Sequence, residues 1–168
     1  MNSIFFHGSK NLSLAQLDWR FSYPRRPFGP AIYLTQDKLV ATMYANGVGT
    51  IYCVRLNGPL DHTVNLDLSV GEQSVVARDA IARLCRIQYR DTDIQDLRSR
   101  DAIYRDPDKG AMANTFLRNR GIWMVYGCLH PLDHSGVLDR GIQYAVLENE
   151  CANIVKQLSP HDPHLFDD

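Results

Sequence analysis

The chain has 168 residues, of which 45% are hydrophobic and 22% are charged, and its formal net charge is −1. This composition is typical of an ordinary globular protein, and the balanced charge gives no global basic field of the kind that attracts nucleic acid. No apolar run approaches the ~18 residues of a membrane-spanning helix, and the N-terminus lacks the basic start and apolar stretch of a signal peptide. We therefore expect a cytoplasmic protein without a membrane partner, with one domain over residues 1–158 and a flexible polar tail over residues 159–168.

The first third of the chain is predicted to alternate short strands with helical segments. In chain order, the predicted elements are a strand over 3–6, one or two helical turns over 12–17, a loop with three prolines over 18–30, a strand over 31–35, a helix over 37–45 and a strand over 50–56. Thr35 or Asp37 could cap the helix, because both side chains carry an oxygen that accepts from free backbone N–H groups.

The rest of the chain combines helices with later strands. The predicted elements are a weaker strand over 63–68, a long helix over 69–89, a charged and partly helical segment over 91–106, a turn over 107–110, a helix over 111–119, a polar loop over 129–140, and strands over 122–126, 141–147 and 152–157. The long helix carries Arg78, Arg83, Arg86 and Arg90, which would form either a phosphate-binding stripe or, as we favour, a solvated face. Together, the predicted helices and strands indicate an α+β fold.

Cysteine and histidine residues give no sign of a metal site. The four cysteines are widely spaced without a C-x-x-C pair, so we expect reduced and mostly buried thiols at Cys53, Cys85, Cys128 and Cys151. Two groups of polar residues could suggest a metal, namely His130, Asp133 and His134, and His161 with His164. Neither group has a third ligand at helical spacing, so we expect no metal.

Three motifs follow one another in an order that points to chemistry. The first is His7-Gly8-Ser9 at the end of the first predicted strand, and the second is Tyr33 in the next strand, with Tyr44 eleven residues later in the helix. The third is the late strand over 141–147, which contains Gln143. Together these motifs resemble those of the diphtheria-toxin-like class of ADP-ribosyltransferases, which includes the poly(ADP-ribose) polymerases.

The resemblance implies a fold and a set of ligand contacts. The fold would be the ADP-ribosyltransferase fold, a split, mostly antiparallel β core of two packed sheets flanked by helices, with NAD⁺ in the cleft. His7 would bind the adenosine ribose, the Gly8 backbone and Ser9 hydroxyl would bind the nicotinamide carboxamide, and Tyr33 and Tyr44 would sandwich the nicotinamide ring. The loop between Trp19 and Gly29 would cover the donor, and Arg25 or Arg26 would meet its pyrophosphate.

Gln143 departs from the family pattern, in which a catalytic glutamate stands at this position of the strand. Glutamine has the same shape and can bind the ribose, but it carries no charge and cannot act as a base. Two interpretations stay open. Either Gln143 replaces a native glutamate in an inactive form, or it is native and the protein is a slow or substrate-assisted transferase.

The expected function is mono-ADP-ribosyl transfer from NAD⁺ to a macromolecular acceptor, with release of nicotinamide. By analogy, such a small domain would be a bacterial or phage toxin or effector, kept in check by a neutralising partner protein. The alternatives are an NAD⁺ glycohydrolase and a catalytically dead module that binds NAD⁺ or another protein. The acceptor, whether protein, DNA, RNA or small molecule, is left open by the sequence.

Overall fold

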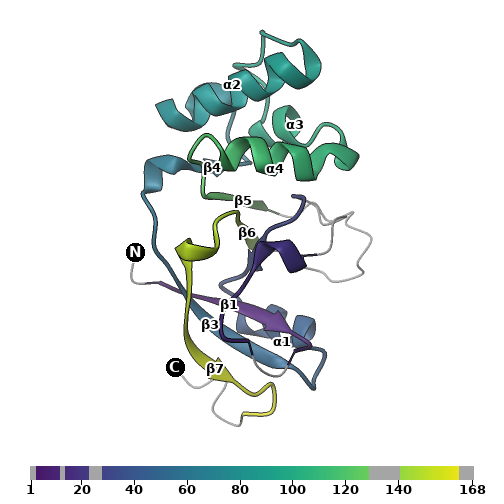
Figure 1. Cartoon of the computed structure of the whole chain (residues 1–168), viewed down its shortest axis with the longest axis vertical. Coiled ribbons are helices and arrows are strands. Elements are labelled where there is room, and N and C mark those ends of the chain that lie inside the picture. Colours follow the sequence, from purple (N-terminus) through teal and green to yellow (C-terminus); the bar gives the residue numbers. More distant parts are fainter. Residues whose placement is uncertain (1–2, 12–13, 23–27, 129–140, 163–168) are drawn as a thin grey trace.

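The computed structural model of the chain describes residues 3–11, 14–22, 28–128 and 141–162 (Figure 1). Seven strands form two sheets in this part of the chain. The first sheet has the order β1-β3-β7 and is antiparallel, with β1 at Ile4–Ser9, β3 at Thr50–Leu56 and β7 at Ala152–Leu158. The second has the order β2-β6-β5-β4, with β2 at Ile32–Leu34, β6 at Ile142–Val146, β5 at Met124–Cys128 and β4 at Thr63–Asn65. Only the β4–β5 pair is parallel, so the predicted α+β class with two mostly antiparallel sheets is confirmed.

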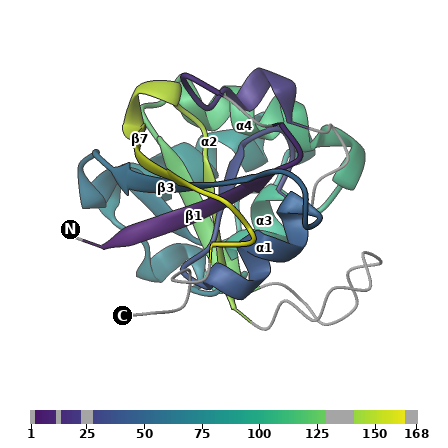
Figure 2. The same ribbon diagram turned by 90° about the horizontal axis from the view of Figure 1, so that it is seen from below.

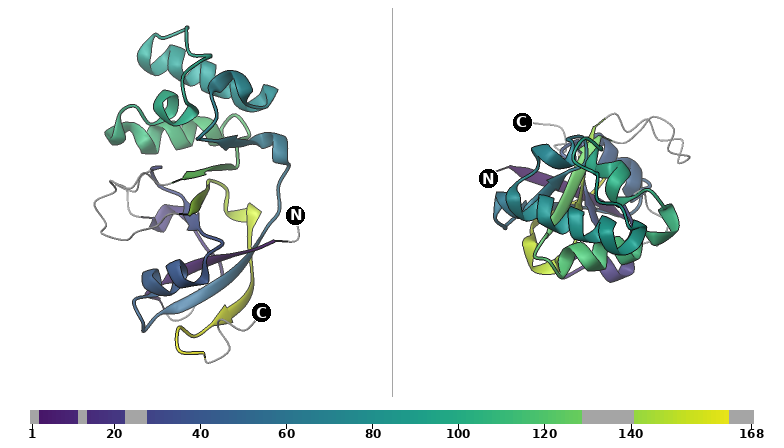
Figure 3. Two further views of the ribbon diagram at one scale, coloured as in Figure 1. Left: turned by 180° about the vertical axis from the view of Figure 1, so that it is seen from behind. Right: turned by 90° about the horizontal axis from the view of Figure 1, so that it is seen from above.

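The helices lie on the outer faces of the two sheets. The described α-helices are α1 at Lys38–Ala45, α2 at Val75–Tyr89, α3 at Ser99–Ile103 and α4 at Gly110–Arg118. Short 3-10 helices lie at Trp19–Phe21, Leu60–His62, Val70–Glu72, Pro107–Lys109 and Asn149–Cys151. Helix α1 lies against the first sheet, whose strands run side by side in Figure 2, whereas α2, α3 and α4 gather beyond the second sheet (Figure 3).

The chain forms four layers, namely α1, the first sheet, the second sheet, and the helices α2, α3 and α4, and an apolar cluster lies between each layer and the next. One lies between the sheets and includes Phe5, Tyr52 and Val146. Another joins α1 to the first sheet through Phe6 and Ala41, and the third packs the second sheet against α2, α3 and α4. Successive side chains of a strand point to opposite faces. His7 therefore shares the inter-sheet face of β1 with Phe5, and Gly8 shares the α1 face with Phe6.

Local side-chain contacts explain where the helices begin. Asp37 caps α1 by accepting from the N–H groups of Leu39 and Val40, at 2.8 and 3.4 Å. The long helix α2 begins at Val75 rather than at residue 69, because the hydroxyl of Ser74 caps it by accepting from the N–H of Ala77 at 3.1 Å. The segment over 69–72 instead forms a separate 3-10 turn.

Two other predictions are wrong. Residues 14–17, which fall in the segment predicted as helical turns, form no helix, and Leu17 is instead buried in the cluster between the sheets. The thiols are free as expected, but only Cys53 and Cys85 are buried, and Cys128 is exposed. Burial raises the pKa of the Cys85 thiol to about 11.

The outer face of α2 is solvated. Arg83, Arg86 and Arg90 are exposed, and Arg83 pairs with Asp79 one turn earlier, at 2.8 Å between Nε and Oδ2. This agrees with the solvated face that we favoured for the arginine series. Within the described ranges, no helix combines the length and the apolar character needed to cross a bilayer.

Candidate functional site

The structure gathers most of the predicted site residues around two cavities that share part of their lining. The inner pocket has a volume of about 40 Å³ and is lined by Phe6, His7, Gly8, Tyr33, Leu34, Thr35, Tyr44 and Gln143. The outer pocket, of about 600 Å³, shares four of these residues, His7, Gly8, Tyr33 and Tyr44, and adds Ser9 and much of the segment over 14–22. Its size is that of a typical ligand site. Arg25 and Arg26, which were predicted to meet the pyrophosphate, lie outside the described residues.

His7 links the two sheets at the mouth of the inner pocket. Its Nδ1 lies 2.8 Å from the carbonyl oxygen of Tyr33. A carbonyl only accepts, so Nδ1 carries the proton of this hydrogen bond. Next to it, Phe6 and Thr35 exchange two backbone hydrogen bonds, at 2.7 and 3.0 Å. The strand of the first motif and the strand of the second are thereby tied together at the site.

Gly8 is required by the packing of α1 on β1. A Cβ atom at this position would lie 1.9 Å from the carbonyl oxygen of Ala41 and 2.9 Å from the backbone nitrogen of Ala45. Both alanines are fully buried. The close approach that this glycine permits is therefore that of the helix carrying Tyr44.

Tyr33 is held in place by the turn that precedes its strand. Its hydroxyl donates to the carbonyl of Gly29 at 2.7 Å and accepts from the N–H of Phe28 at 3.0 Å. The rings of Tyr33 and Phe28 are stacked, with centroids 6.4 Å apart and an interplanar angle of 21°. The eleven-residue spacing puts the second tyrosine, Tyr44, in the last turn of α1, so that both line the two cavities.

Asn114 in helix α4 supports this turn, and the sequence analysis did not identify it. Its side chain is 4% exposed, and its Nδ2 donates to the carbonyls of Phe28 and Pro30 at 2.6 and 2.9 Å. Its Oδ1 accepts from the hydroxyl of Tyr104 at 2.7 Å. The only local signal was an amide residue on the buried face of a helix, which is uncommon without a partner.

We expect Asn114→Ala to lower the free energy of unfolding by about 2–4 kcal/mol, because it leaves two buried carbonyls and a buried hydroxyl without partners. The turn that holds Tyr33 would loosen as well, so ligands of the inner pocket should bind more weakly. Urea denaturation measures the first effect. Asn119→Ala, an exposed amide at the end of the same helix, is the matched control and should change stability little. Equal stability of the two variants would contradict the role given to Asn114.

Gln143 occupies the buried end of the inner pocket. It lies in β6 opposite Gly127 of β5 and is 5% exposed. Its Oε1 is buried and has no hydrogen-bond partner among the described residues. A buried amide oxygen without a donor is costly and uncommon. The atom is thus placed to accept a hydrogen bond from a ligand hydroxyl or N–H group.

The inner pocket has no carboxylate of its own. None of its described lining residues is aspartate or glutamate. The groups that can exchange a proton there are the imidazole of His7 and the hydroxyls of two tyrosines and Thr35. Among its described lining residues, the pocket therefore offers hydrogen-bonding groups but no anionic side chain that could act as a base.

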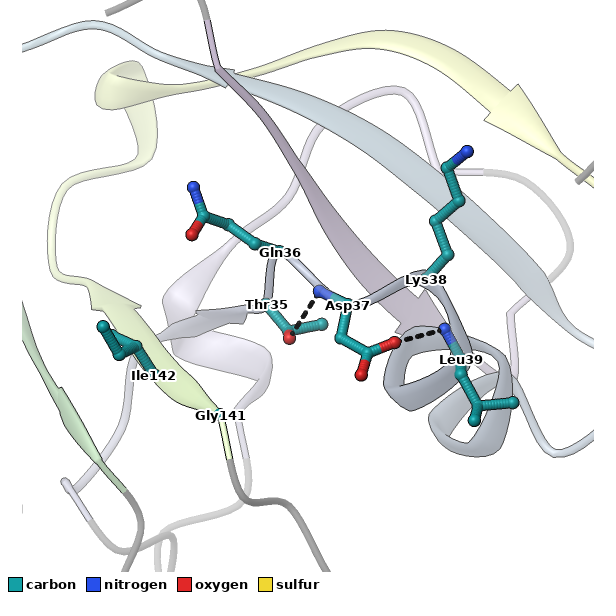
Figure 4. Close-up of a pocket in the computed structure, with 7 residues that line it drawn as sticks. All are labelled: Thr35, Gln36, Asp37, Lys38, Leu39, Gly141 and Ile142. Atoms are coloured by element: carbon teal, nitrogen blue, oxygen red, sulfur yellow. Dashed lines mark hydrogen bonds between the residues drawn. The ribbon is translucent and has the colours of Figure 1, made fainter. Parts of the chain in front are cut away.

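An open groove shares Thr35 with the inner pocket, and Figure 4 shows the residues that line it. It has a volume of about 770 Å³ and is lined by Thr35, Gln36, Asp37, Lys38, Leu39, Gly141 and Ile142. Thr35 accepts from the N–H of Asp37 at 3.0 Å, and the Asp37 carboxylate turns toward the first turn of α1. Thr35 is the one residue that the groove and the inner pocket have in common among the described residues.

No group of three or more histidine, cysteine or acidic side chains that could hold a metal ion occurs in the part of the chain that the structure describes. His130, Asp133, His134 and His164 lie outside that part. Comparison of the chain with protein-family models, with curated proteins and with solved structures found no match.

Proposed function

We propose that the chain binds NAD⁺ in the two pockets and transfers its ADP-ribose to a macromolecular acceptor, within an ADP-ribosyltransferase fold. The observation that supports this most strongly is the convergence of three separate motifs on one cavity. His7, Tyr33, Tyr44 and Gln143 come from four different elements and line the same inner pocket. The buried, unpartnered oxygen of Gln143 gives that cavity a hydrogen-bond acceptor that a ligand would satisfy.

The nicotinamide ring would occupy the inner pocket, between the side chains of Tyr33 and Tyr44. The bond between the ribose C1′ and the ring nitrogen breaks, its electron pair leaves with nicotinamide, and positive charge develops on the ribose. Gln143 Oε1 accepts from a ribose hydroxyl and so orients the sugar, and its dipole favours the developing charge. The acceptor then forms a bond to C1′. Because no described lining residue of the pocket is a carboxylate, the acceptor arrives as a nucleophile or loses its proton to the imidazole of His7 or to solvent.

Calorimetric titration with NAD⁺ and chromatography of the released nicotinamide test this proposal together. We expect binding, slow nicotinamide release, and transfer of label from NAD⁺ into macromolecules of a cell lysate. Free ADP-ribose as the sole product would instead identify a glycohydrolase. The absence of NAD⁺ binding would refute the proposal, and with it the toxin or effector role that the resemblance suggests.

Tyr44→Ala is expected to weaken NAD⁺ binding about twofold to twelvefold, because one ring stack is worth about 0.5–1.5 kcal/mol. Tyr44 lies on the half-buried side of α1, so the helix should keep its fold. Val48→Ala, at an exposed position just beyond the same helix, is the control and should bind NAD⁺ as the unaltered chain does. The dissociation constant from calorimetry decides between the two outcomes.

A catalytically dead NAD⁺-binding module is the second candidate, and Gln143 is the observation that favours it. This candidate predicts NAD⁺ binding without nicotinamide release from the chain as it stands. It also predicts no release after a carboxylate is introduced at position 143.

A further inference from the structure

The outer pocket is far larger than the inner pocket, at about 600 Å³ against about 40 Å³. It shares His7, Gly8, Tyr33 and Tyr44 with the inner pocket and has a wall that the inner pocket lacks. Part of this wall comes from the segment over 14–22, which ends in the 3-10 helix Trp19–Phe21. Phe21 lies in this wall and is 89% exposed, the highest value of any large hydrophobic side chain in the described chain.

The exposure of Phe21 does not come from a loosely held segment. Leu17, four residues earlier, is buried between the sheets. Trp19 donates its backbone N–H to Asn149 Oδ1 at 3.1 Å, and the guanidinium of Arg118 lies 3.9 Å from the centre of its ring. The backbone N–H of Phe21 itself donates to the carbonyl of Asp18 at 3.2 Å.

Asp18 strengthens the turn that presents Phe21. Its carboxylate accepts from the backbone N–H of Arg20 at 2.9 Å and pairs with the Arg20 guanidinium. Hydrogen bonds from Arg20 hold the pKa of the Asp18 carboxyl well below its usual value. An aromatic ring is therefore displayed at the pocket rim on a short, anchored turn, although burying it would be favourable.

We infer that Phe21 is the stacking surface for the adenine ring of NAD⁺. This inference rests on the proposed function, which places nicotinamide in the inner pocket, whereas Phe21 lines only the outer one. A dinucleotide has two flat rings at its ends, and the inner pocket, with a volume of about 40 Å³, leaves no room for the second. An aromatic side chain stacks on any nucleobase, because every base has a π face, and it needs no hydrogen-bond pattern to do so.

The two mononucleotide halves of NAD⁺ separate this role from a general effect on the pocket. AMP carries the adenine half and nicotinamide mononucleotide carries the other, with the same phosphate on each. We expect Phe21→Ala to weaken AMP binding about tenfold by calorimetry and to leave nicotinamide mononucleotide binding unchanged. Phe21→Trp, which keeps a stacking surface, should restore AMP binding. Val48→Ala, another exposed apolar side chain, is the control.

The other outcomes of these titrations distinguish failure of the role of Phe21 from failure of the proposed function. Unchanged AMP binding by Phe21→Ala, with NAD⁺ still bound, overturns the role of Phe21 alone and leaves the proposed function standing. Equal weakening of both mononucleotides overturns it as well, because it indicates a displaced segment rather than a lost stack. If the unaltered chain binds NAD⁺ but not AMP, the adenine subsite lies elsewhere. If it binds neither NAD⁺ nor either half, the proposed function itself fails.

Discussion

Replacing Gln143 with glutamate is expected to raise the rate of nicotinamide release by about 10²- to 10⁴-fold, the usual contribution of a well-placed acid–base group. The new carboxylate would keep the shape of the side chain and its hydrogen bond to the ribose. It would add a negative charge beside the carbon on which positive charge develops, and it could take the proton of the acceptor. NAD⁺ affinity should change much less than the rate, because the two side chains accept the same hydrogen bond.

The pH dependence of Gln143→Glu supplies a second signature. Burial disfavours the charged form and raises the pKa of a carboxyl group. Activity should therefore rise with pH as this carboxyl ionises. The free energy of unfolding should move the opposite way. A carboxyl group whose pKa is higher in the folded than in the unfolded state stabilises the fold at pH values below its unfolded pKa. This stabilisation is lost as the pH rises through the folded-state pKa. Rate and melting temperature measured over the same pH range test both signs.

Gln95→Glu is the matched control for this variant, because it adds the same charge at an exposed position outside both pockets. It should leave nicotinamide release unchanged. If Gln143→Glu binds NAD⁺ without a gain in turnover, the transferase proposal gives way to the dead binding module.

Gly8→Ala is expected to destabilise the fold by about 3 kcal/mol or more, at the upper end of the cost of overpacking a core. The added Cβ would meet backbone atoms of α1, which cannot rotate away as the end of a flexible side chain could. The whole helix would have to move. Urea denaturation in the absence of NAD⁺ measures the effect directly, since the clash does not involve a ligand.

Gly47→Ala provides the comparison for this substitution. Nothing lies within 4 Å of a Cβ at Gly47, so its cost is only that of the left-handed backbone, with φ at +70°. That cost is about 1–2 kcal/mol. If Gly8→Ala proved no less stable than Gly47→Ala, α1 would have to tolerate displacement from β1.

The same substitution bears on the site. His7 lies in β1 and Tyr44 in α1, and Gly8 sets the distance between the two elements. Moving α1 outward separates the two side chains across the pocket. At a temperature where Gly8→Ala is still folded, we therefore expect weaker NAD⁺ binding than in Gly47→Ala.

Much of the candidate site could be predicted because it is built from local patterns. The alternation in residues 50–56 gave the central strand with its observed bounds. A short strand, a capping aspartate and two turns of helix bring Tyr33 and Tyr44 to one place, and these are signals that lie within a dozen residues of each other. The motif order then predicted that His7 and Gln143 would join them, and both line the inner pocket.

The sequence by itself determined the residue types of the pocket, the α+β class and the uncharged side chain at position 143. Only the tertiary structure decided that Gly8 is required by helix α1, that Leu17 is buried between the sheets, and that Asn114 holds a turn 86 residues away. It also decided that the oxygen of Gln143 is buried with no donor among the residues that the structure describes. The physical reason is that periodicity and capping act between neighbours in the chain, whereas burial, steric contact and hydrogen-bond satisfaction depend on segments that meet only when the layers pack.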